Sequence, residues 1–438
     1  MSDFLIGLSQ EGKTIDEKIN DFTANTVEKN NFEEQITDYL STKNLFNKEV
    51  LHDYLKSNKY TQQQFCNGID PNNINTSELA GWAIKFENII NKYCQSEHDI
   101  QTQTILQSIH PFVMYVSEKV SSIVTDSGIS IDQNALENIT QKYIHEILNL
   151  VEKVLIVELH TYKEQTGFNT RDSRTQFIEF IDAEFSTPNK IKKFYRRYPA
   201  LSRLIMTRTD FHLSAVQKLF TALKKEKNNI NKIVDTVSTV TKINLGVGDG
   251  HVGGQSVAII YFGEKKLIYK PRDDYIAEQF GLFLNWINEQ NEFLSMVSPN
   301  GIYRDNYAFI EFVEAKSCKT KKDISNFYER YGYLIALGYL LSMNDLHLEN
   351  VIAYGEFPVL VDVETMMVPE IQESSKTPSI IEQFNQKYVK ETILSSILLP
   401  NIAKLAGGVE LSGLSGDEQI IPEKQLIPVN VKGHVKMS

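Results

Sequence analysis

The chain contains little cysteine and no long apolar run, and both shortages narrow the class of protein. Its 438 residues include three cysteines, which stand far apart at Cys66, Cys94 and Cys318. Three scattered thiols form no disulfide framework and no cysteine-based zinc site, and they suit a reducing compartment, so we expect a cytoplasmic protein. No apolar run reaches the roughly 18 residues of a membrane-spanning helix. Residues 1–18 lack the basic and apolar regions of a signal peptide, so we expect no integral membrane segment.

Positive charge is also in short supply. The formal net charge is −11, from 45 Lys and Arg residues against 56 Asp and Glu residues. A general nucleic-acid binder needs a basic surface to neutralise phosphates, so we expect no nucleic-acid partner. Hydrophobic residues, in contrast, make up 42% of the chain and aromatic residues 10%. This composition can fill large cores, and the length predicts two or three domains.

The first 240 residues carry helical patterns, which we divide into an N-terminal helical cap at 1–100 and a helical domain at 101–240. In the cap, the sequence predicts helices at 32–40, 48–55 and 77–93, with a turn at 70–73. In the helical domain, one apolar stripe at helical spacing predicts a long helix. Its members are Ile144, Ile147, Leu148, Val151 and Leu155. The pair Thr187-Pro188, a hydroxyl cap followed by proline, predicts the start of another helix.

A cluster of Lys and Arg residues from Lys190 to Arg197 is the clearest basic patch in this half of the chain. The simpler interpretation is a solvated helix face. The functional alternative is a contact for phosphate or for an acidic peptide.

At about residue 240 the pattern changes, and we assign 241–315 to a kinase-like N-lobe. Five glycines within 246–254 predict a glycine-rich turn whose backbone N–H groups can approach phosphate oxygens. Two β-rich runs then flank the dipeptide Gly263-Glu264 and predict a hairpin. Lys270 closes the second strand, where a kinase-like lobe places the lysine that pairs with nucleotide phosphates.

The sequence after Lys270 predicts a helix at 275–288, two short strands that end at Glu314 and a helix at 321–343. In kinases the first of these helices supplies a glutamate to the lysine. Glu278 and Glu289 are the candidates, and a solvated surface carboxylate is the simpler interpretation of each. We assign 316–438 to a partial kinase-like C-lobe.

The chemistry is concentrated in residues 342–365, where Asp345 and Asn350 stand five apart and Asp362 follows twelve residues later. Phosphoryl transfer from ATP needs one carboxylate beside the attacking hydroxyl, and an amide oxygen and a second carboxylate that hold Mg²⁺. A turn followed by a hairpin can bring these three groups together. The alternative interpretation is a loop with an Asx turn and an ordinary acidic strand end.

With these motifs in place, the chain resembles the N-terminal dehydratase domain of class II lanthipeptide (lantibiotic) synthetases of the LanM type. The matching stretches run from about residue 100 to the C-terminus. They include GDGHVGGQSVAII, KLIYKPR, FYERYGYLIALGYLLSMNDLHLENVIAYGEFPVLVDVET, ILSSILLP and VELSGLSG. The combination of G-D-x-H, Y-K-P-R and D-L-H-x-E-N is more specific than any single kinase motif.

The resemblance implies an α+β, lipid-kinase-like fold of two lobes with a large helical region. It implies that ATP phosphorylates Ser and Thr of a precursor peptide, and that phosphate is then eliminated to leave dehydroalanine or dehydrobutyrine. It places Lys270 at the ATP phosphates, Asp345 at the substrate hydroxyl, and Asn350 and Asp362 on Mg²⁺.

The resemblance also places Asp249, His251 and His347 in the active site. A neutral histidine near pH 7 can shuttle a proton in either reaction. The alternative for His347 is a core histidine that fixes its loop.

The sequence departs from the family at its C-terminal end. It carries no Cys and His cluster of the zinc-binding cyclase, and no counterpart of the segment whose Arg and Thr residues serve phosphate elimination. We therefore expect phosphorylation, leave elimination open, and expect a separate C-terminal half or cyclase as a partner beside the precursor peptide. Two other functions stay open: a small-molecule phosphotransferase of the aminoglycoside or choline type, and an inactive fragment that serves as a partner subunit.

Overall fold

The computed structural model describes most of the chain as two compact units. The described residues are 3–21, 36–37, 48–69, 79–94, 104–168, 172–234, 239–367, 380–381, 392–400, 411–414, 428–431 and 434–437. Unit 1 comprises Met1–Lys119, Tyr143–Leu213 and Leu426–Ser438, and unit 2 comprises Val120–Lys142 and Ser214–Gln425. These boundaries differ from the divisions at 100, 240 and 315 suggested by the sequence, because the long helices α8 (Gln133–Thr166) and α11 (Pro199–Val234) each supply residues to both units.

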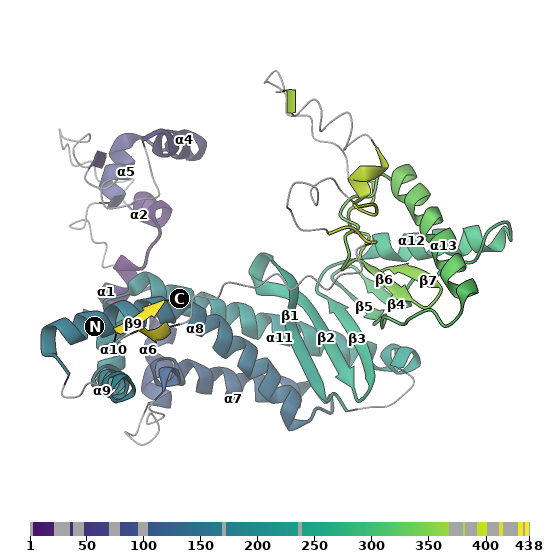
Figure 1. The fold of residues 1–438 in the computed structure, drawn as a ribbon. Helices are drawn as coiled ribbons and strands as arrows, with labels where there is room; N and C mark the ends of the chain where they lie inside the picture. Colours follow the sequence, from purple (N-terminus) through teal and green to yellow (C-terminus); the bar gives the residue numbers. More distant parts are fainter. Residues whose placement is uncertain are drawn as a thin grey trace. The chain divides into compact units, whose positions relative to one another are not determined.

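Unit 1 is built mainly from helices (Figure 1). They are α1 (Asp3–Glu11), α2 (Ile15–Asp21), α4 (Lys48–Asn58), α5 (Gln62–Ile69), α6 (Gly81–Tyr93), the 3-10 helix η2 (Ile105–Ser108), α7 (His110–Ser127, which continues into unit 2), α9 (Ser173–Phe185) and α10 (Pro188–Arg196), with the adjoining parts of α8 and α11. Two short strands, β8 (Pro428–Val431) and β9 (His434–Met437), form a hairpin. Among the described residues, no helix is long and apolar enough to cross a membrane.

Several predictions for these helices are confirmed. The predicted helices at 48–55 and 77–93 correspond to α4 and α6, and the Thr187 hydroxyl accepts a hydrogen bond from the Lys190 backbone N–H to cap α10. The predicted stripe lies on α8, where Ile147, Val151 and Leu155 are buried. The predicted turn at 70–73 lies outside the described residues, as does the helix at 32–40 apart from 36–37.

The basic cluster at Lys190–Arg197 agrees with the interpretation as a solvated helix face, because Lys190, Lys193 and Arg197 are exposed. Three of its side chains also form ion pairs within unit 1. Lys192 pairs with Glu87 at 3.0 Å and Arg196 with Glu11 at 2.7 Å. Arg197 pairs with Glu158 at 2.7 Å and with Glu184 at 2.6 Å. These carboxylates belong to four different helices, so the cluster joins α10 to α1, α6, α8 and α9.

Unit 2 contains a five-stranded antiparallel sheet of order β1-β2-β3-β5-β4 (Figure 1). Its strands are β1 (Lys242–His251), β2 (Gln255–Phe262), β3 (Lys265–Lys270), β4 (Gly301–Arg304) and β5 (Tyr307–Glu311). The predicted hairpin around Gly263 is confirmed as β2–β3, and the two short predicted strands are β4 and β5.

The prediction that the glycine-rich stretch at 246–254 is a turn is wrong for most of its length, which forms a strand. Residues up to His251 extend β1 and pair with β2, and only the 3-10 turn η3 (Val252–Gly254) reverses the chain. Gly246 and Gly248 take φ of 77° and 73°, and the strand register shifts on both sides of Val247. Glycine makes these conformations accessible, so the stretch forms an irregular strand rather than a loop.

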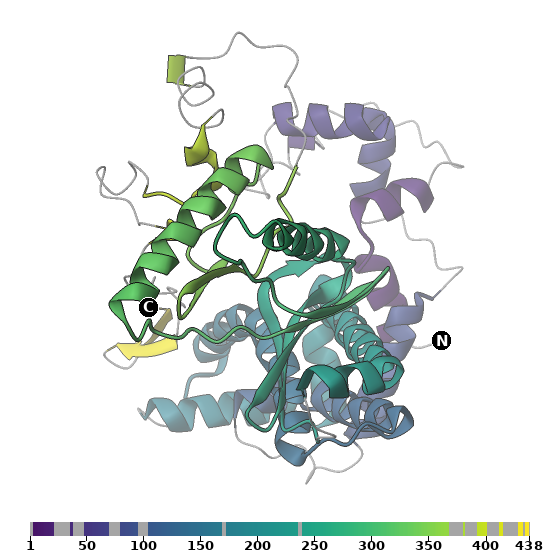
Figure 2. The same cartoon turned by 90° about the vertical axis from the view of Figure 1, so that its right-hand side faces the viewer.

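The rest of unit 2 packs helices against a small hairpin. Helix α12 (Tyr275–Glu289) follows β3, and α13 (Lys321–Leu340), the long green helix of Figure 2, precedes the hairpin of β6 (Val351–Tyr354) and β7 (Phe357–Leu360). The 3-10 helix η5 (Ile393–Ser396) completes the described elements. One core joins these parts through buried Phe280, Leu284, Tyr331, Leu334 and Leu360, among others.

A buried carboxylate connects α11 to the sheet of unit 2. Glu226 accepts two hydrogen bonds of 2.9 Å from Arg304 in β4, one of 3.1 Å from Tyr307 in β5 and one of 2.7 Å from Asn229. Burial acts to raise the pKa of Glu226, but these donors together lower it. The network fixes the β4–β5 edge of the sheet against the helix.

In unit 1, the pair of Glu17 and Arg203 gives a pH-dependent contribution to stability. The Arg203 hydrogen bond lowers the Glu17 pKa from 4.5 to about 2. The contribution is therefore complete above about pH 4.5 and is lost as the pH falls toward 2. Because both side chains are partly exposed, we expect Glu17→Gln to lower the free energy of unfolding by only about 0.5–1 kcal/mol at pH 7.

The measurement is urea unfolding of the wild-type and variant chains from pH 7 to pH 3.5. The difference between them should shrink as the pH falls, while Glu49→Gln, at an exposed position of α4, should have no effect at any pH. A difference that stays constant with pH would contradict this account of the pair.

Candidate functional site

In unit 2 the end of strand β3 meets the end of the β6–β7 hairpin through Lys270. Its side chain is 6% exposed, and Nζ lies 2.9 Å from Asp274 Oδ2 and 3.5 Å from Asp362 Oδ1. A buried ammonium group is costly unless carboxylates compensate its charge. The structure thus brings together the lysine and the second carboxylate that the sequence singled out.

Asp274 was not predicted as part of the site. It stands at the N-cap position of α12, yet its side chain makes no cap hydrogen bond and its carboxylate, 2% exposed, faces Lys270. Burial raises the pKa of Asp274, and the Lys270 ammonium group opposes that rise. The signal in the sequence was the run K-P-R-D-D, in which an acid stands four residues after the lysine.

The two glutamates considered from the sequence do not take this place. Glu289 is exposed and Glu278 is half-buried, and within the described part of the chain neither forms an ion pair with Lys270. The interpretation as surface carboxylates therefore fits Glu289.

Arg272 brings a second cation to the same place. One of its nitrogens lies 3.8 Å from Asp362 Oδ2, and another pairs closely with Glu364. The backbone N–H of Glu364 also donates to Asp362 Oδ1 at 3.2 Å. The carboxylate of Asp362 is thus held by Lys270, Arg272 and a backbone donor.

The loop from Asp345 to Asn350 is fixed by its own side chains. The Asn350 amide donates to the Asp345 carbonyl at 2.8 Å and lies 3.3 Å from His347 Nε2. His347 Nδ1 accepts from the Glu349 backbone N–H at 3.2 Å, and Nε2 lies 3.9 Å from Asp345 Oδ1. These bonds support the loop-fixing role of His347 and leave it beside the exposed Asp345 carboxylate.

The hairpin aligns Asn350 with Asp362. Val351 pairs with Leu360 at the open end of β6–β7, and the Val361 backbone N–H donates to the Asn350 carbonyl at 3.0 Å. The two candidate magnesium ligands therefore flank the same end of one hairpin.

Asp249 and His251 lie in β1, where His251 pairs with Gln255 at the start of β2. Their side chains fall outside what the structure describes. Their place in an active site stays a prediction.

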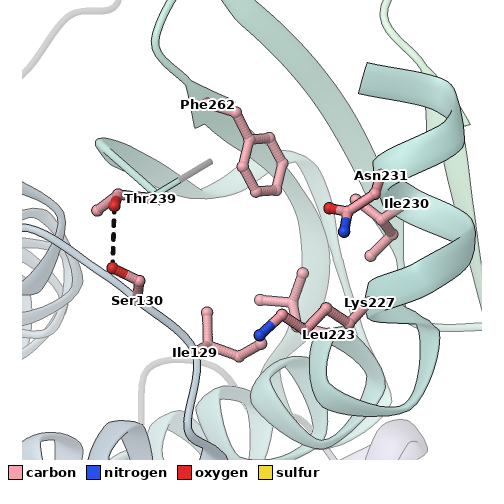
Figure 3. A pocket seen from close by; sticks show the side chains of 8 residues that line it. All are labelled: Ile129, Ser130, Leu223, Lys227, Ile230, Asn231, Thr239 and Phe262. Atoms are coloured by element: carbon pink, nitrogen blue, oxygen red, sulfur yellow. Dashed lines mark hydrogen bonds between the residues drawn. The ribbon is translucent and has the colours of Figure 1, made fainter. Parts of the chain in front are cut away.

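Two cavities among the described residues of unit 2 lie apart from these residues. One of about 210 Å³ is lined by eight residues of α11 and the neighbouring segments, with a hydrogen bond of 2.9 Å between Ser130 and Thr239 (Figure 3). Another, of about 650 Å³, lies beside the start of β3 and residues 311–314. Neither is lined by Lys270, Asp345, Asn350 or Asp362.

The donor set suits magnesium better than a metal that needs a complete protein cage. Among the described residues, no group of three or more His, Cys, Asp and Glu side chains could hold a metal ion. Mg²⁺ is usually bound through one or two carboxylates together with substrate phosphates and water. An amide oxygen from Asn350 and a carboxylate from Asp362 fit that pattern.

Comparison with known proteins gives the class of protein. The lacticin 481/lactococcin biosynthesis protein LcnDR2 of Lactococcus lactis subsp. lactis is 26% identical over 289 residues. The alignment covers 62% of this chain and 30% of that relative, so the chain spans less than a third of the relative's length.

The family itself is defined by a second match. Residues 198–435, more than half of the 438-residue chain, match the family described as a domain of unknown function, DUF4135. The chain belongs to this family. Together the two matches confirm the resemblance to class II lanthipeptide synthetases of the LanM type.

The backbone at Asp345 generates a prediction that is independent of activity. Its φ is 59°, in the left-handed region, which Asp and Asn tolerate and β-branched residues do not. We expect Asp345→Asn to leave the free energy of unfolding nearly unchanged and Asp345→Val to lower it by about 1–2 kcal/mol. Urea unfolding of both variants decides the matter, and equal stabilities would show that this conformation is not retained in solution.

Proposed function

We propose that the chain acts in lanthipeptide biosynthesis as the phosphorylating part of a peptide Ser/Thr dehydratase. The observation that carries the proposal is the approach of Lys270 to Asp362 at 3.5 Å, next to the loop of Asp345 and Asn350. The name of the relative, a lacticin 481/lactococcin biosynthesis protein, supports a precursor peptide as the substrate class.

We infer a kinase-like fold of two lobes for unit 2 from its element order. A five-stranded antiparallel sheet with a lysine at the end of β3 is followed by a helix, a further helix and a hairpin that carries polar residues at its open end. This order matches the arrangement of parts in kinases. It supports the two-lobed interpretation.

In the proposed reaction, ATP supplies the phosphoryl group and Mg²⁺ neutralises charge on its phosphates. Asn350 and Asp362 would hold the metal, and Lys270 would contact the phosphates. The Ser or Thr hydroxyl oxygen attacks the γ-phosphorus, ADP leaves, and Asp345 orients the hydroxyl and accepts its proton. His347, whose Nε2 lies 3.9 Å from Asp345 Oδ1, would assist that proton transfer.

The second proposed reaction is elimination from the phosphorylated residue. A base removes the Cα proton, the Cα–Cβ double bond forms and phosphate leaves with the electrons of the Cβ–O bond. Phosphate is a better leaving group than hydroxide, which explains why ATP would be consumed. Asp249 and His251 are the candidates for this step.

The proposal predicts that Lys270→Met and Asp362→Asn lose the rise in Tm that ATP and Mg²⁺ give the wild-type chain by mass action. We expect phosphorylation of the lacticin 481 precursor peptide, measured by mass spectrometry, to fall by about a hundredfold or more in both variants. Glu289→Gln, on the exposed side of α12, is the matched control and should behave as wild type.

The products decide between the proposed function and its alternatives. Phosphate adducts without loss of water indicate the phosphorylation half alone, and loss of water indicates the complete dehydratase. Turnover of ATP with small alcohols and none with peptide would establish a small-molecule phosphotransferase instead. Absence of any ATP–Mg²⁺ binding would leave a non-catalytic partner subunit as the function.

A further inference from the structure

Asp274 is a buried acid that lies beside Lys270, and the two residues are close in sequence as well as in space. The two residues are four apart in sequence, and their side chains are 6% and 2% exposed. Pro271, Arg272 and Asp273 lie between them and connect the end of β3 to the start of α12. The pair therefore forms within one short connection and does not depend on where the body of α12 lies.

The direction of the Asp274 carboxylate is unusual for a residue at the N-cap position of a helix. An aspartate there ordinarily accepts a hydrogen bond from the first turn of its helix. In α12 only the backbone carbonyl of Asp274 serves the helix, by accepting from the N–H groups of Ala277 and Glu278 at 3.0 and 3.3 Å. The carboxylate makes no cap hydrogen bond, and its Oδ2 lies 2.9 Å from Lys270 Nζ.

The other charged groups nearby have different partners. Arg272 pairs with Glu364 and approaches Asp362, so it does not compete for Asp274. Asp362 is 29% exposed and lies farther from Lys270 than Asp274 does. A ligand can reach Asp362 more easily, and Asp274 would then remain as the fixed partner of the lysine.

We propose that Asp274 is the positioning residue that keeps the Lys270 ammonium group aimed at the nucleotide phosphates when Asp362 turns to the metal. This inference rests on the proposed function. In protein kinases the acid comes from within the helix, so the pair forms only when that helix is in place. Here the acid precedes the helix, so the lysine is oriented without any movement of α12.

The test compares Asp274→Asn with Asp274→Glu, using the full chain. Asparagine is a good N-cap, so we expect Asp274→Asn to fold. We expect it to raise the KM for ATP by about tenfold, because the buried ion pair that orients the lysine is lost. The KM for the lacticin 481 precursor peptide should stay unchanged, and Asp274→Glu should recover part of the ATP effect.

Two control variants test whether the effect on the KM for ATP is specific to Asp274 or is shared by other carboxylates nearby. Asp273→Asn removes the neighbouring exposed carboxylate, and Glu278→Gln removes the first acid within the helix. Both should keep the KM for ATP within about twofold of wild type, since neither contacts Lys270. An unchanged KM in Asp274→Asn, or a tenfold rise in Glu278→Gln, would overturn the proposal.

A second measurement does not depend on ATP and so separates this inference from the proposed function. Asp274→Asn and Lys270→Met are combined in a double-mutant cycle read by the urea midpoint of the free protein. We expect the double variant to lose clearly less than the sum of the single losses. Additive losses of stability would refute the pairing of Lys270 with Asp274. If the losses are coupled but the wild-type chain binds no ATP–Mg²⁺, only the proposed function is refuted.

Discussion

The contact between Lys270 and Asp362 is the interaction on which the arrangement of unit 2 depends. It joins the last residue of β3 to the second residue after the β6–β7 hairpin, so it connects the five-stranded sheet to the more C-terminal half of the unit. An ammonium group that is 6% exposed requires carboxylates around it, because an uncompensated buried charge would cost several kcal/mol. Asp274 from one side and Asp362 from the other meet that requirement.

The position of Asp362 is in turn set by the far end of its hairpin. Arg330 of α13 donates to the Glu356 carbonyl and carboxylate at 3.0 and 2.9 Å, and its guanidinium lies 4.1 Å from the centre of the Phe357 ring. Its Nε donates to the Ser295 carbonyl, in the loop between α12 and β4, at 2.7 Å. One buried arginine therefore ties the turn of the hairpin to α13 and to the loop after α12, while the open end presents Asn350 and Asp362.

The sequence revealed those parts of the site whose spacing reflects local geometry. Asp345, Asn350 and Asp362 are set by one loop and one hairpin, and Lys270 by the end of a strand, so the sequence pattern could indicate that these candidate residues lie near one another. The sequence does not predict Asp274 as part of the site, because an acid before a helix is ordinarily an N-cap. The structure shows that its carboxylate faces Lys270 instead.

The parts of the fold that could not be predicted depend on contacts between residues far apart in sequence. The ion pairs of the cluster at Lys190–Arg197 could not be predicted, because several of their carboxylates lie far away in sequence, Glu11 being 185 residues from Arg196. The glycines at 246 and 248 suggested a turn because a sequence does not show strand pairing. Their positive φ values accommodate register shifts within β1.

The charges around Asp362 bear on how a nucleotide would arrive. Lys270 and Arg272 contribute +2 and Asp274, Asp362 and Glu364 contribute −3, so the cluster carries a formal charge of −1. Free ATP, with its own negative charge, meets a cluster that does not attract it, whereas a divalent cation is attracted to Asp362. On the proposed function, Asp362 would hold the metal, whose charge would compensate its carboxylate. Lys270 would then keep Asp274 as its partner and would be available to the phosphates.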